Sequence, residues 1–293
     1  MALKDRIAFF DLLCSNFSCD RPAPLIAVHK IDEKVYDRLN HAVRVYVSRC
    51  ISQGPPLDEE ALLEELEFRR DQIPNCTPNG LIKPYRHVGS EVNKVYEAFA
   101  ALLANLKIES CVQAFYGLVD VRFKEGMVYQ KNLGRDYSTE ELHVDSWATG
   151  ITDYVRVLIP ILGDIEGNKV EFYMPPDHFK ESWLYKLPNY KAGLEITRQY
   201  SLVNVSVPRG SVCFFDGSVV HRTVRAESSG GRISFGNSIY TKVPEIDDPI
   251  RPFLSFDDIM SIGKDKFLYF QSFDQNHNFS KNSKHWELVP ISK

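Results

Sequence analysis

The residue types that could bind a metal ion lie in two short segments of this 293-residue sequence. His143 and Asp145 stand in Glu141-Leu-His-Val-Asp-Ser-Trp147, and His221 stands in Val219-Val-His-Arg-Thr-Val224. On an extended chain, side chains two positions apart point to one face, so the imidazole and the carboxylate would lie side by side. Two histidines and one carboxylate can occupy one face of an iron(II) ion and leave other positions open. These three residues are therefore the predicted metal ligands.

Taken alone, the His-x-Asp pair is a weak signal. With 8 histidines and 39 acidic residues, about one such His-x-Asp or His-x-Glu pair is expected by chance in a chain of this length. A second instance, His285-Trp-Glu287, follows a polar stretch and is followed by no histidine. We assign it no role. The alternative for His143 is a hydrogen-bonded histidine at the end of a strand.

The sequence after the distal histidine strengthens the metal prediction. Arg232 follows His221 by eleven positions, and Arg232 and Ser234 share one face of an expected strand. A guanidinium offers a carboxylate two parallel donors, and the serine hydroxyl adds a third. An arginine inside a protein needs an anionic partner. Taken one at a time, Arg232 is more commonly part of a surface salt bridge, and Ser234 more commonly carries a solvent-facing hydroxyl. At this spacing, however, the two residues together predict a dicarboxylate site.

This order of motifs resembles the iron(II)/2-oxoglutarate-dependent oxygenase superfamily. The run Val207-Pro-Arg-Gly-Ser-Val-Cys-Phe-Phe-Asp-Gly-Ser-Val-Val-His221 is similar to the segment before that family's distal histidine. The resemblance covers roughly residues 113 to 241 and identifies no subfamily. It implies a mainly β fold with flanking helices, the double-stranded β-helix (a cupin-like jelly roll). It also implies Fe(II) on His143, Asp145 and His221, with 2-oxoglutarate and O2 as co-substrates.

The resemblance implies a reaction class as well. 2-Oxoglutarate would give succinate and CO2 while a substrate is oxidised, and the protein would position the reactants and exclude water. Related halogenases carry a small residue in place of the carboxylate ligand, so Asp145 favours hydroxylation, with desaturation or cyclisation as alternatives. We expect a small polar or anionic substrate. A peptide or protein side chain as substrate, and a non-oxygenase metal-binding jelly roll, are the alternatives.

Further residues are candidates for the walls of the site. Tyr129 lies on an expected strand where related enzymes often bond 2-oxoglutarate, although packing is the commoner role of such a tyrosine. Trp147 follows Asp145 by two positions and should share its face, as a substrate-binding wall or as a core residue. Arg156 lies between apolar neighbours on an expected strand. It therefore binds an anionic substrate or pairs with a buried carboxylate.

The segment from Pro175 to Tyr200 interrupts the strand pattern for longer than ordinary connections do. It carries Trp183, Tyr185 and Tyr190. We expect a mobile lid in which Trp183 contacts the substrate. The alternative is a segment packed permanently on the outside of the barrel.

The elements that must position these residues change character along the chain. Helical periodicity predicts helices at residues 32–52, at 57–70 and from 90 onward. From residue 111 the period becomes that of strands, which are expected at 112–123, 127–132, 154–162, 169–174, 201–207, 212–215 and 232–243. Successive strands with few intervening helices favour an antiparallel barrel or sandwich.

We therefore expect one oxygenase domain over residues 1–293. Its parts would be a mainly helical flank at 1–110, a β-helix core at 111–243 and a C-terminal extension at 244–293, with one helix around 256–267.

Composition and charge exclude several partner classes. The hydrophobic fraction of 44% is that of a folded globular protein. A net charge of −4 without a basic stripe argues against a nucleic-acid partner. Six scattered cysteines with no Cys-x-x-Cys pair are expected to be free thiols. The N-terminal apolar run is too short for a signal sequence or a membrane span, so we expect a cytoplasmic location and no membrane partner.

Overall fold

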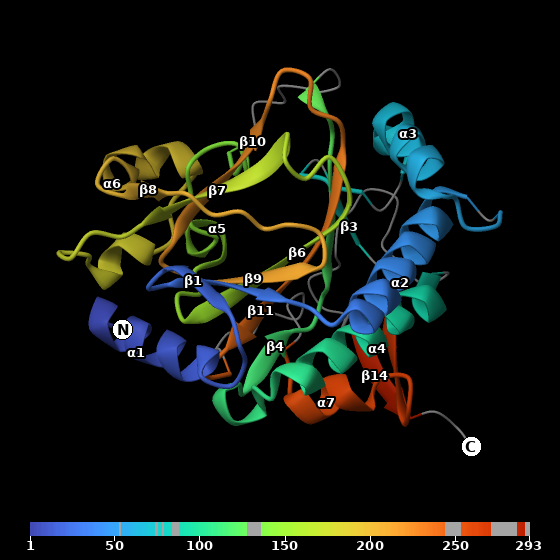
Figure 1. Ribbon diagram of the computed structural model, residues 1–293, viewed down its shortest axis with the longest axis horizontal. Helices are drawn as coiled ribbons and strands as arrows, with labels where there is room; N and C mark the ends of the chain where they lie inside the picture. The colour runs from blue at the N-terminus through green and yellow to red at the C-terminus, as the bar shows by residue number, and fades with distance from the viewer. Residues whose placement is uncertain are drawn as a thin grey trace.

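Two antiparallel sheets face each other at the centre of the protein (Figure 1). The computed structural model describes residues 1–52, 54–73, 76–77, 79–83, 88–127, 136–243, 253–270 and 286–290. Strands of both sheets line one cavity, and Phe172 of the small sheet packs on Phe215 of the large sheet with ring centroids 5.1 Å apart. Two facing antiparallel sheets with flanking helices confirm the predicted fold class.

The large sheet has the order β1-β2-β9-β6-β11-β4-β12, and β5 also pairs with β11 and with β3. Its strands are β1 (Asp20–Ala23), β2 (Ile26–Lys30), β3 (Leu81–Ile82), β4 (Ala114–Tyr116), β5 (Asp120–Lys124), β6 (Tyr154–Gly163), β9 (Ser211–Asp216), β11 (Arg232–Tyr240) and β12 (Phe253–Leu254). The small sheet has the order β10-β7-β8, with β7 (Asn168–Met174), β8 (Ser201–Val203) and β10 (Val220–Arg225). Every residue of β11 is buried, because the strand lies at the centre of the large sheet.

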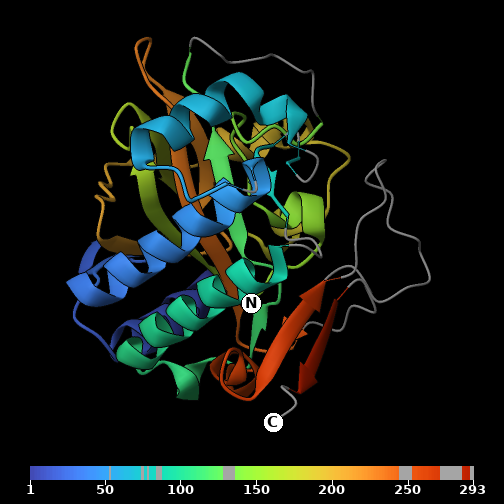
Figure 2. The same ribbon diagram turned by 90° about the vertical axis from the view of Figure 1, so that its right-hand side faces the viewer.

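Helices cover the face of the large sheet that points away from the small sheet. Helices α2 (Glu33–Ile51) and α4 (Gly89–Leu106) lie side by side there, with α3 (Glu59–Arg69) beside them (Figure 2). The side chains of Asp32 and Asp58 accept hydrogen bonds from the first turns of α2 and α3, which fixes where these helices begin. Phe99 of α4 packs against Phe235 with ring centroids 5.0 Å apart, so the main core lies between helices and sheet.

A bulge near the end of β6 is held by α2. Ile233 pairs with Leu162 and Ser234 pairs with Pro160, so one residue of β6 is left over. The hydroxyl of Tyr36 donates to the Pro160 carbonyl at 2.9 Å, and the side-chain amide of Asn40 donates to the Ile161 carbonyl at 3.1 Å. These bonds satisfy the carbonyls that the irregular ladder leaves free.

The C-terminal part of the chain packs on α4. Helix α7 (Phe256–Ser261) is followed by a hairpin of β13 (Lys266–Phe270) and β14 (Trp286–Pro290). The side chain of Asn93 donates to the Leu268 carbonyl and accepts from the Leu268 amide, both at 2.8 Å. This reciprocal pair substitutes for a ladder contact and fixes β13 against the helix.

The predicted helices agree with α2, α3 and α4, but several strands differ. The expected helical flank also contains β1 and β2, and β2 joins the large sheet through β9. The expected strand 112–123 is broken into β4 and β5, which pair with different parts of β11. The expected strand 201–207 ends at Val203, and β10 was not foreseen. The expected helix 256–267 ends at Ser261 because β13 pairs with β14. The expected strand 127–132 lies, from residue 128 on, outside the described residues.

Three further features concern the N-terminus, the cysteines and the surface. Helix α1 (Leu3–Cys14) is an additional helix that the sequence did not predict. The six cysteines are free thiols, as expected.

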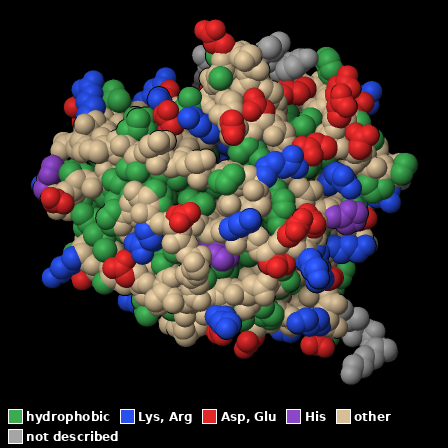
Figure 3. Space-filling model, viewed as in Figure 1, with side chains coloured by type: hydrophobic (Ala, Val, Ile, Leu, Met, Phe, Trp, Pro, Cys, Tyr) green, Lys and Arg blue, Asp and Glu red, His purple; other side chains and the backbone are tan. Residues whose placement is uncertain are grey.

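Within the described ranges, no helix combines the length and the apolar character that crossing a lipid bilayer requires. On the face shown in Figure 3, the coloured Lys and Arg side chains are interspersed with Asp and Glu.

Arg6 joins α1 to the end of β9. Its side chain is fully buried, with Nη1 3.1 Å from the Asp216 carboxylate and Nη2 3.1 Å from Asp153 and 3.0 Å from Glu181. Burial alone would lower the pKa of Arg6, but Asp216 and Glu181 raise it above its ordinary value. The cluster therefore holds a charged arginine between α1, β9 and the segment 175–200.

We expect Arg6→Met to lower the free energy of unfolding by about 3–5 kcal/mol, because it leaves a buried carboxylate without its partner. Urea unfolding followed by circular dichroism measures this change. Arg198→Met is the matched control, since Arg198 is exposed and, within the described part of the chain, forms its ion pair with Glu195 of its own turn alone. Its effect should stay below about 1 kcal/mol. Equal stability of the two variants would contradict the role assigned to the cluster.

Candidate metal centre

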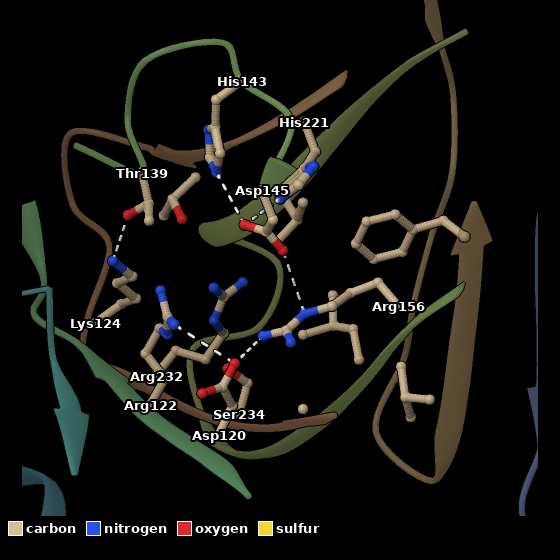
Figure 4. Close-up of a pocket in the computed structure, with 16 residues that line it drawn as sticks. Asp120, Arg122, Lys124, Thr139, His143, Asp145, Arg156, His221, Arg232 and Ser234 are labelled. Atoms are coloured by element: carbon tan, nitrogen blue, oxygen red, sulfur yellow. Dashed lines mark hydrogen bonds and ion pairs between the residues drawn. The ribbon is translucent and has the colours of Figure 1, made fainter. Parts of the chain in front are cut away.

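The three predicted ligands meet at one mouth of the space between the sheets (Figure 4). His221 lies on β10, and its backbone forms a two-way bridge with His143, with N···O distances of 3.1 and 2.9 Å. Asp145 Oδ1 lies 3.7 Å from His143 Nε2 and 3.9 Å from His221 Nε2. One ligand atom from each residue lies within 4.8 Å of the other two. The predicted ligands are therefore brought together as a group that can hold one metal ion.

Backbone carbonyls fix the direction in which both imidazoles point. His143 Nδ1 lies 2.7 Å from the Glu141 carbonyl, and His221 Nδ1 lies 3.3 Å from the Val219 carbonyl. Donation from Nδ1 leaves the lone pair of each ring on Nε2, the atom that faces Asp145. The Tyr190 ring stacks on His143 with centroids 4.2 Å apart and planes inclined by 18°, so the His143 ring is also held by packing.

The protonation states also suit metal binding. Burial lowers the pKa of His143 to about 3, and the neighbouring His221 contributes to the shift. Burial lowers the pKa of His221 as well. Burial alone would raise the pKa of Asp145, but Arg156 and the two histidines hold it below its ordinary range. At neutral pH the group therefore consists of two neutral imidazoles and one carboxylate.

Arg156 on β6 pairs with two carboxylates. It forms a hydrogen-bonded ion pair with Asp120, its Nη1 donates to the Ser238 hydroxyl at 3.0 Å, and its Nε lies 3.6 Å from Asp145 Oδ2. Of the two roles that the sequence left open, pairing with a buried carboxylate is present. Arg156 thereby orients the ligand Asp145. A direct role of Arg156 in substrate binding stays a prediction.

Arg232 and Ser234 line the cavity that also contains the three ligands, and we call this the inner cavity. Both residues are 5% exposed. Among the described residues Arg232 has no hydrogen-bond or ion-pair partner, and its Nε is buried without one. Burial lowers the pKa of Arg232 to about 10, and the positive charges of Arg225 and Arg122 add to this shift. The inner cavity therefore contains a buried cation that has no anionic partner among the residues that the structure describes.

Sequence reasoning missed two cations that line the same cavity. Arg122 and Lys124 lie on β5, opposite Ser234 and Arg232 of β11. Lys124 is 3% exposed, and its Nζ donates to the Asn79 carbonyl at 3.1 Å and to the Thr139 hydroxyl. Burial and then Arg122 lower its pKa well below the ordinary value. Charged residues alternate with Val121 and Phe123 along β5, and this period of two was the available signal.

Of the two roles that the sequence left open for Trp147, the structure has that of a core residue, and the expected shared face with Asp145 is not present. The backbone of Asp145 is already in the right-handed helical region, and α5 (Ser146–Thr149) begins at the next residue, so the alternation that would place Trp147 beside Asp145 is lost. Its side chain is fully buried and donates from Nε1 to the Trp183 carbonyl at 2.6 Å. The indole also packs so closely on Gly193 that a Cβ there would lie 2.2 Å from it. Trp147 is a core residue.

Of the two remaining predicted wall residues, Trp183 does not line the inner cavity. Trp183 packs against Phe179 and Tyr200, with ring centroids 6.1 and 6.2 Å away. Trp183 therefore packs within the segment 175–200 and does not lie beside the metal ligands. Tyr129 lies outside the described residues.

The segment 175–200 is packed against its neighbours. It contains the short turns η5 (Glu181–Leu184), η6 (Tyr190–Gly193) and α6 (Leu194–Thr197). The Leu187 amide donates to the Trp147 carbonyl at 3.0 Å, and the Tyr137 hydroxyl donates to the Leu187 carbonyl at 2.7 Å. These contacts agree with the alternative to a lid, a segment that is packed on the rest of the protein. Tyr190 of this segment reaches the site. Its motion as a lid stays a prediction.

Comparisons with known proteins give structural neighbours alone. No family model and no curated protein matches the sequence. A non-haem, alpha-ketoglutarate-dependent carbocyclase of nogalamycin biosynthesis, SnoK, is 12% identical, with 98% of this chain and 96% of that chain covered and a TM-score of 0.42. An N-substituted L-amino acid dioxygenase from Burkholderia ambifaria AMMD is 12% identical, with 78% and 85% covered and a TM-score of 0.40. EctD from S. alaskensis, with 2-oxoglutarate and 5-hydroxyectoine, is 11% identical, with 82% and 76% covered and a TM-score of 0.38.

These neighbours include oxygenases of the kind that the sequence resembles. At such TM-scores the likeness carries no argument about activity, which must come from the chain's own residues.

We expect His143→Ala and His221→Ala each to abolish stoichiometric binding of Fe(II), because two of three ligands form an incomplete site. Anaerobic calorimetry with Fe(II), and with Co(II) as a spectroscopic substitute, measures the loss. His178→Ala is the control, since His178 is exposed and bonds Gln199. Full Fe(II) binding by both ligand variants would refute the metal assignment.

The buried histidines also predict a pH dependence for the metal-free protein. The pKa values of both histidines are lowered in the folded state, so below about pH 6.5 the unfolded chain binds protons that the folded chain does not. The free energy of unfolding therefore decreases as the pH is lowered. The slope should reach about 1.4 kcal/mol per pH unit for each histidine. Urea unfolding at pH 7, 6 and 5 should show a shallower slope for His143→Gln than for wild type or His178→Gln. Identical slopes would count against a neutral buried His143.

Proposed function

We propose that this chain is an Fe(II)- and 2-oxoglutarate-dependent oxygenase that oxidises a small polar or anionic molecule. The observation that best supports this proposal is the pairing of two features in one cavity. His143, Asp145 and His221 converge at its mouth, and the guanidinium of Arg232, which has no partner among the described residues, lies on its wall.

The donor set fits iron(II). Two imidazole nitrogens and one carboxylate oxygen face a common point, and they come from residues whose other polar atoms are bonded to the protein. Such a set binds a metal on one side only, so the positions that face the inner cavity stay available to small molecules. Arg156 holds the carboxylate ligand in place, a role of the kind that tunes metal sites in general.

The opposite wall of the inner cavity fits the far carboxylate of a dicarboxylate. A buried cation without a partner is unfavourable, and a charge-assisted bond from a carboxylate to Arg232 would relieve this cost. The Ser234 hydroxyl lies on the same strand face and supplies a further donor. 2-Oxoglutarate would place one end on the metal and the other on Arg232 and Ser234. A non-oxygenase jelly roll would have no use for this pair.

The protein's own residues have separate tasks in the proposed reaction. His143 and His221 hold the metal through Nε2, Asp145 completes the set, and Arg232 with Ser234 orients the co-substrate. When bound, iron and 2-oxoglutarate supply the oxidising chemistry, in which O2 is consumed and succinate and CO2 are released. Tyr190 and Phe215 cover the two imidazoles and keep water from them. The carboxylate ligand favours hydroxylation, with desaturation or cyclisation as alternatives.

We expect Arg232→Ala to weaken 2-oxoglutarate binding by at least about tenfold, because a charge-assisted contact contributes roughly 1.5–3 kcal/mol. Anaerobic calorimetry with the Fe(II)-loaded protein measures the dissociation constant, and succinate formation in the presence of a metabolite pool measures turnover. Arg222→Ala is the matched control, because Arg222 pairs with Glu171 on the neighbouring strand β7 of the small sheet and does not line the inner cavity. Unchanged affinity of the Arg232 variant would mean that another cation binds the co-substrate.

A further inference from the structure

A second cavity adjoins the inner cavity, and we call it the outer cavity. The two share Asp120, Arg122, Thr139, Asp145 and Arg156, whereas Arg232 and Ser234 line the inner cavity and not the outer one. The outer cavity has a volume of about 260 Å³, which is close to the lower end of the range for sites that bind small organic molecules. A molecule in the outer cavity would therefore lie next to the metal ligand Asp145 without displacing the co-substrate.

The walls of the outer cavity are rich in tyrosine. Tyr116, Tyr137, Tyr154, Tyr190 and Tyr240 all line it. Tyr137 and Tyr190 meet edge to face with centroids 5.1 Å apart, and Tyr154 and Tyr240 lie 6.3 Å apart. Aromatic walls favour a planar or cyclic ligand, and their hydroxyls can bond polar substituents.

The hydroxyls of Tyr154 and Tyr190 support this interpretation. Neither hydroxyl has a hydrogen-bond partner among the described residues. Neither oxygen is fully buried, so both are accessible from the cavity. Both hydroxyls are therefore free to contact a molecule in the outer cavity.

One cation at the junction of the two cavities has uncommitted donors. Arg156 donates to Asp120 and Ser238, and Lys124 donates to Asn79 and Thr139. Arg122 differs. Among the described residues the one polar contact of its side chain is an ion pair with Asp120 at 3.6 Å, which is beyond hydrogen-bond distance, and this side chain is 24% exposed. The guanidinium of Arg122 therefore lines both cavities with donors to spare.

The charge balance of the outer cavity favours an anion there. Its charged wall residues are Asp120 and Asp145 against Arg122 and Arg156, so the described walls are neutral as a set. On the proposed function, the two positive charges of a divalent metal on Asp145 are offset by the dianionic co-substrate in the inner cavity. The guanidinium of Arg232 then leaves an excess of one positive charge over the two cavities, even before Lys124 is counted. A monoanion in the outer cavity would reduce this excess, and a cation would be repelled.

We infer that the substrate is a ring-bearing organic monoanion whose acid group binds Arg122 and whose ring lies against the outer tyrosines. This inference rests on the proposed function, and it specifies the substrate class of the same site. The acid group lies at the junction, so the ring carbons nearest to it face the metal side. The rival assignment is that Arg122 helps Arg232 to bind 2-oxoglutarate, since Arg122 pairs across the strands with Ser234.

The test measures probe binding to the full chain loaded with Zn(II), with and without saturating 2-oxoglutarate. Phenylacetate supplies ring and charge, phenylacetamide supplies the ring without the charge, and acetate supplies the charge without the ring. We expect phenylacetate to bind at least about tenfold more tightly than either control probe, by calorimetry or ligand-observed NMR. Arg122→Gln should abolish this preference over phenylacetamide, Arg122→Lys should retain part of it, and Arg222→Gln should leave it unchanged.

Three results would overturn the inference. They are the absence of phenylacetate binding to wild type at millimolar concentration, equal binding of phenylacetamide, and a loss of 2-oxoglutarate affinity in Arg122→Gln as large as in Arg232→Ala. Failure of the proposed function looks different. In that case neither Arg232→Ala nor Arg122→Gln alters 2-oxoglutarate binding, whereas phenylacetate still depends on Arg122. Zinc stoichiometry and circular dichroism of each variant establish that it is folded.

Discussion

The geometry of the whole site depends on two backbone hydrogen bonds between His143 and His221. They attach a short extended stretch to the edge of the small sheet, and this places two imidazoles side by side with ring centroids 4.4 Å apart. The chain then turns into α5 directly after Asp145, so the carboxylate closes the third side. The turn also sends Trp147 into the core, where it supports the segment that carries Tyr190. One local bridge therefore determines both the ligands and their packing.

A second constraint is the excess of positive charge between the sheets. Arg122, Lys124, Arg156 and Arg232 all line the inner cavity, and the acidic residues of its lining are Asp120 and Asp145. Asp120 is shared by Arg156 and Arg122, and Asp145 is committed to the metal position. Burying such an excess is costly for the empty protein. The inner cavity should therefore bind anions selectively, because each bound anion lowers the free-energy cost of the buried positive charge.

The sequence predicted what depends on short periods and on strong motifs. Helices α2, α3 and α4 follow from spacing alone, because a helix stripe is a local pattern. The three ligands needed the alternating pair His143 and Asp145 together with the order of His221, Arg232 and Ser234 further along the chain. Trp147 was misplaced because alternation cannot show where a strand ends and a helical turn begins. The pairing of β2 with β9, and the meeting of Arg122 with Ser234, join residues far apart in the chain. Such contacts are set by sheet register, which the local pattern of either strand does not contain.

Strand β6 runs past all of these positions in order. Tyr154 lines the outer cavity, Arg156 lies at the junction and Leu158 lines the inner cavity, each two residues after the last. A strand rises about 3.3 Å per residue, so neighbouring positions on this face are roughly 7 Å apart. The depth of a side chain between the outer and the inner cavity is therefore set by its position along β6, in steps of two residues. Moving an anchoring side chain by one step would shift a bound molecule by about the width of a six-membered ring. Enzymes with the same three ligands could in this way oxidise different carbons of similar molecules without any change at the metal.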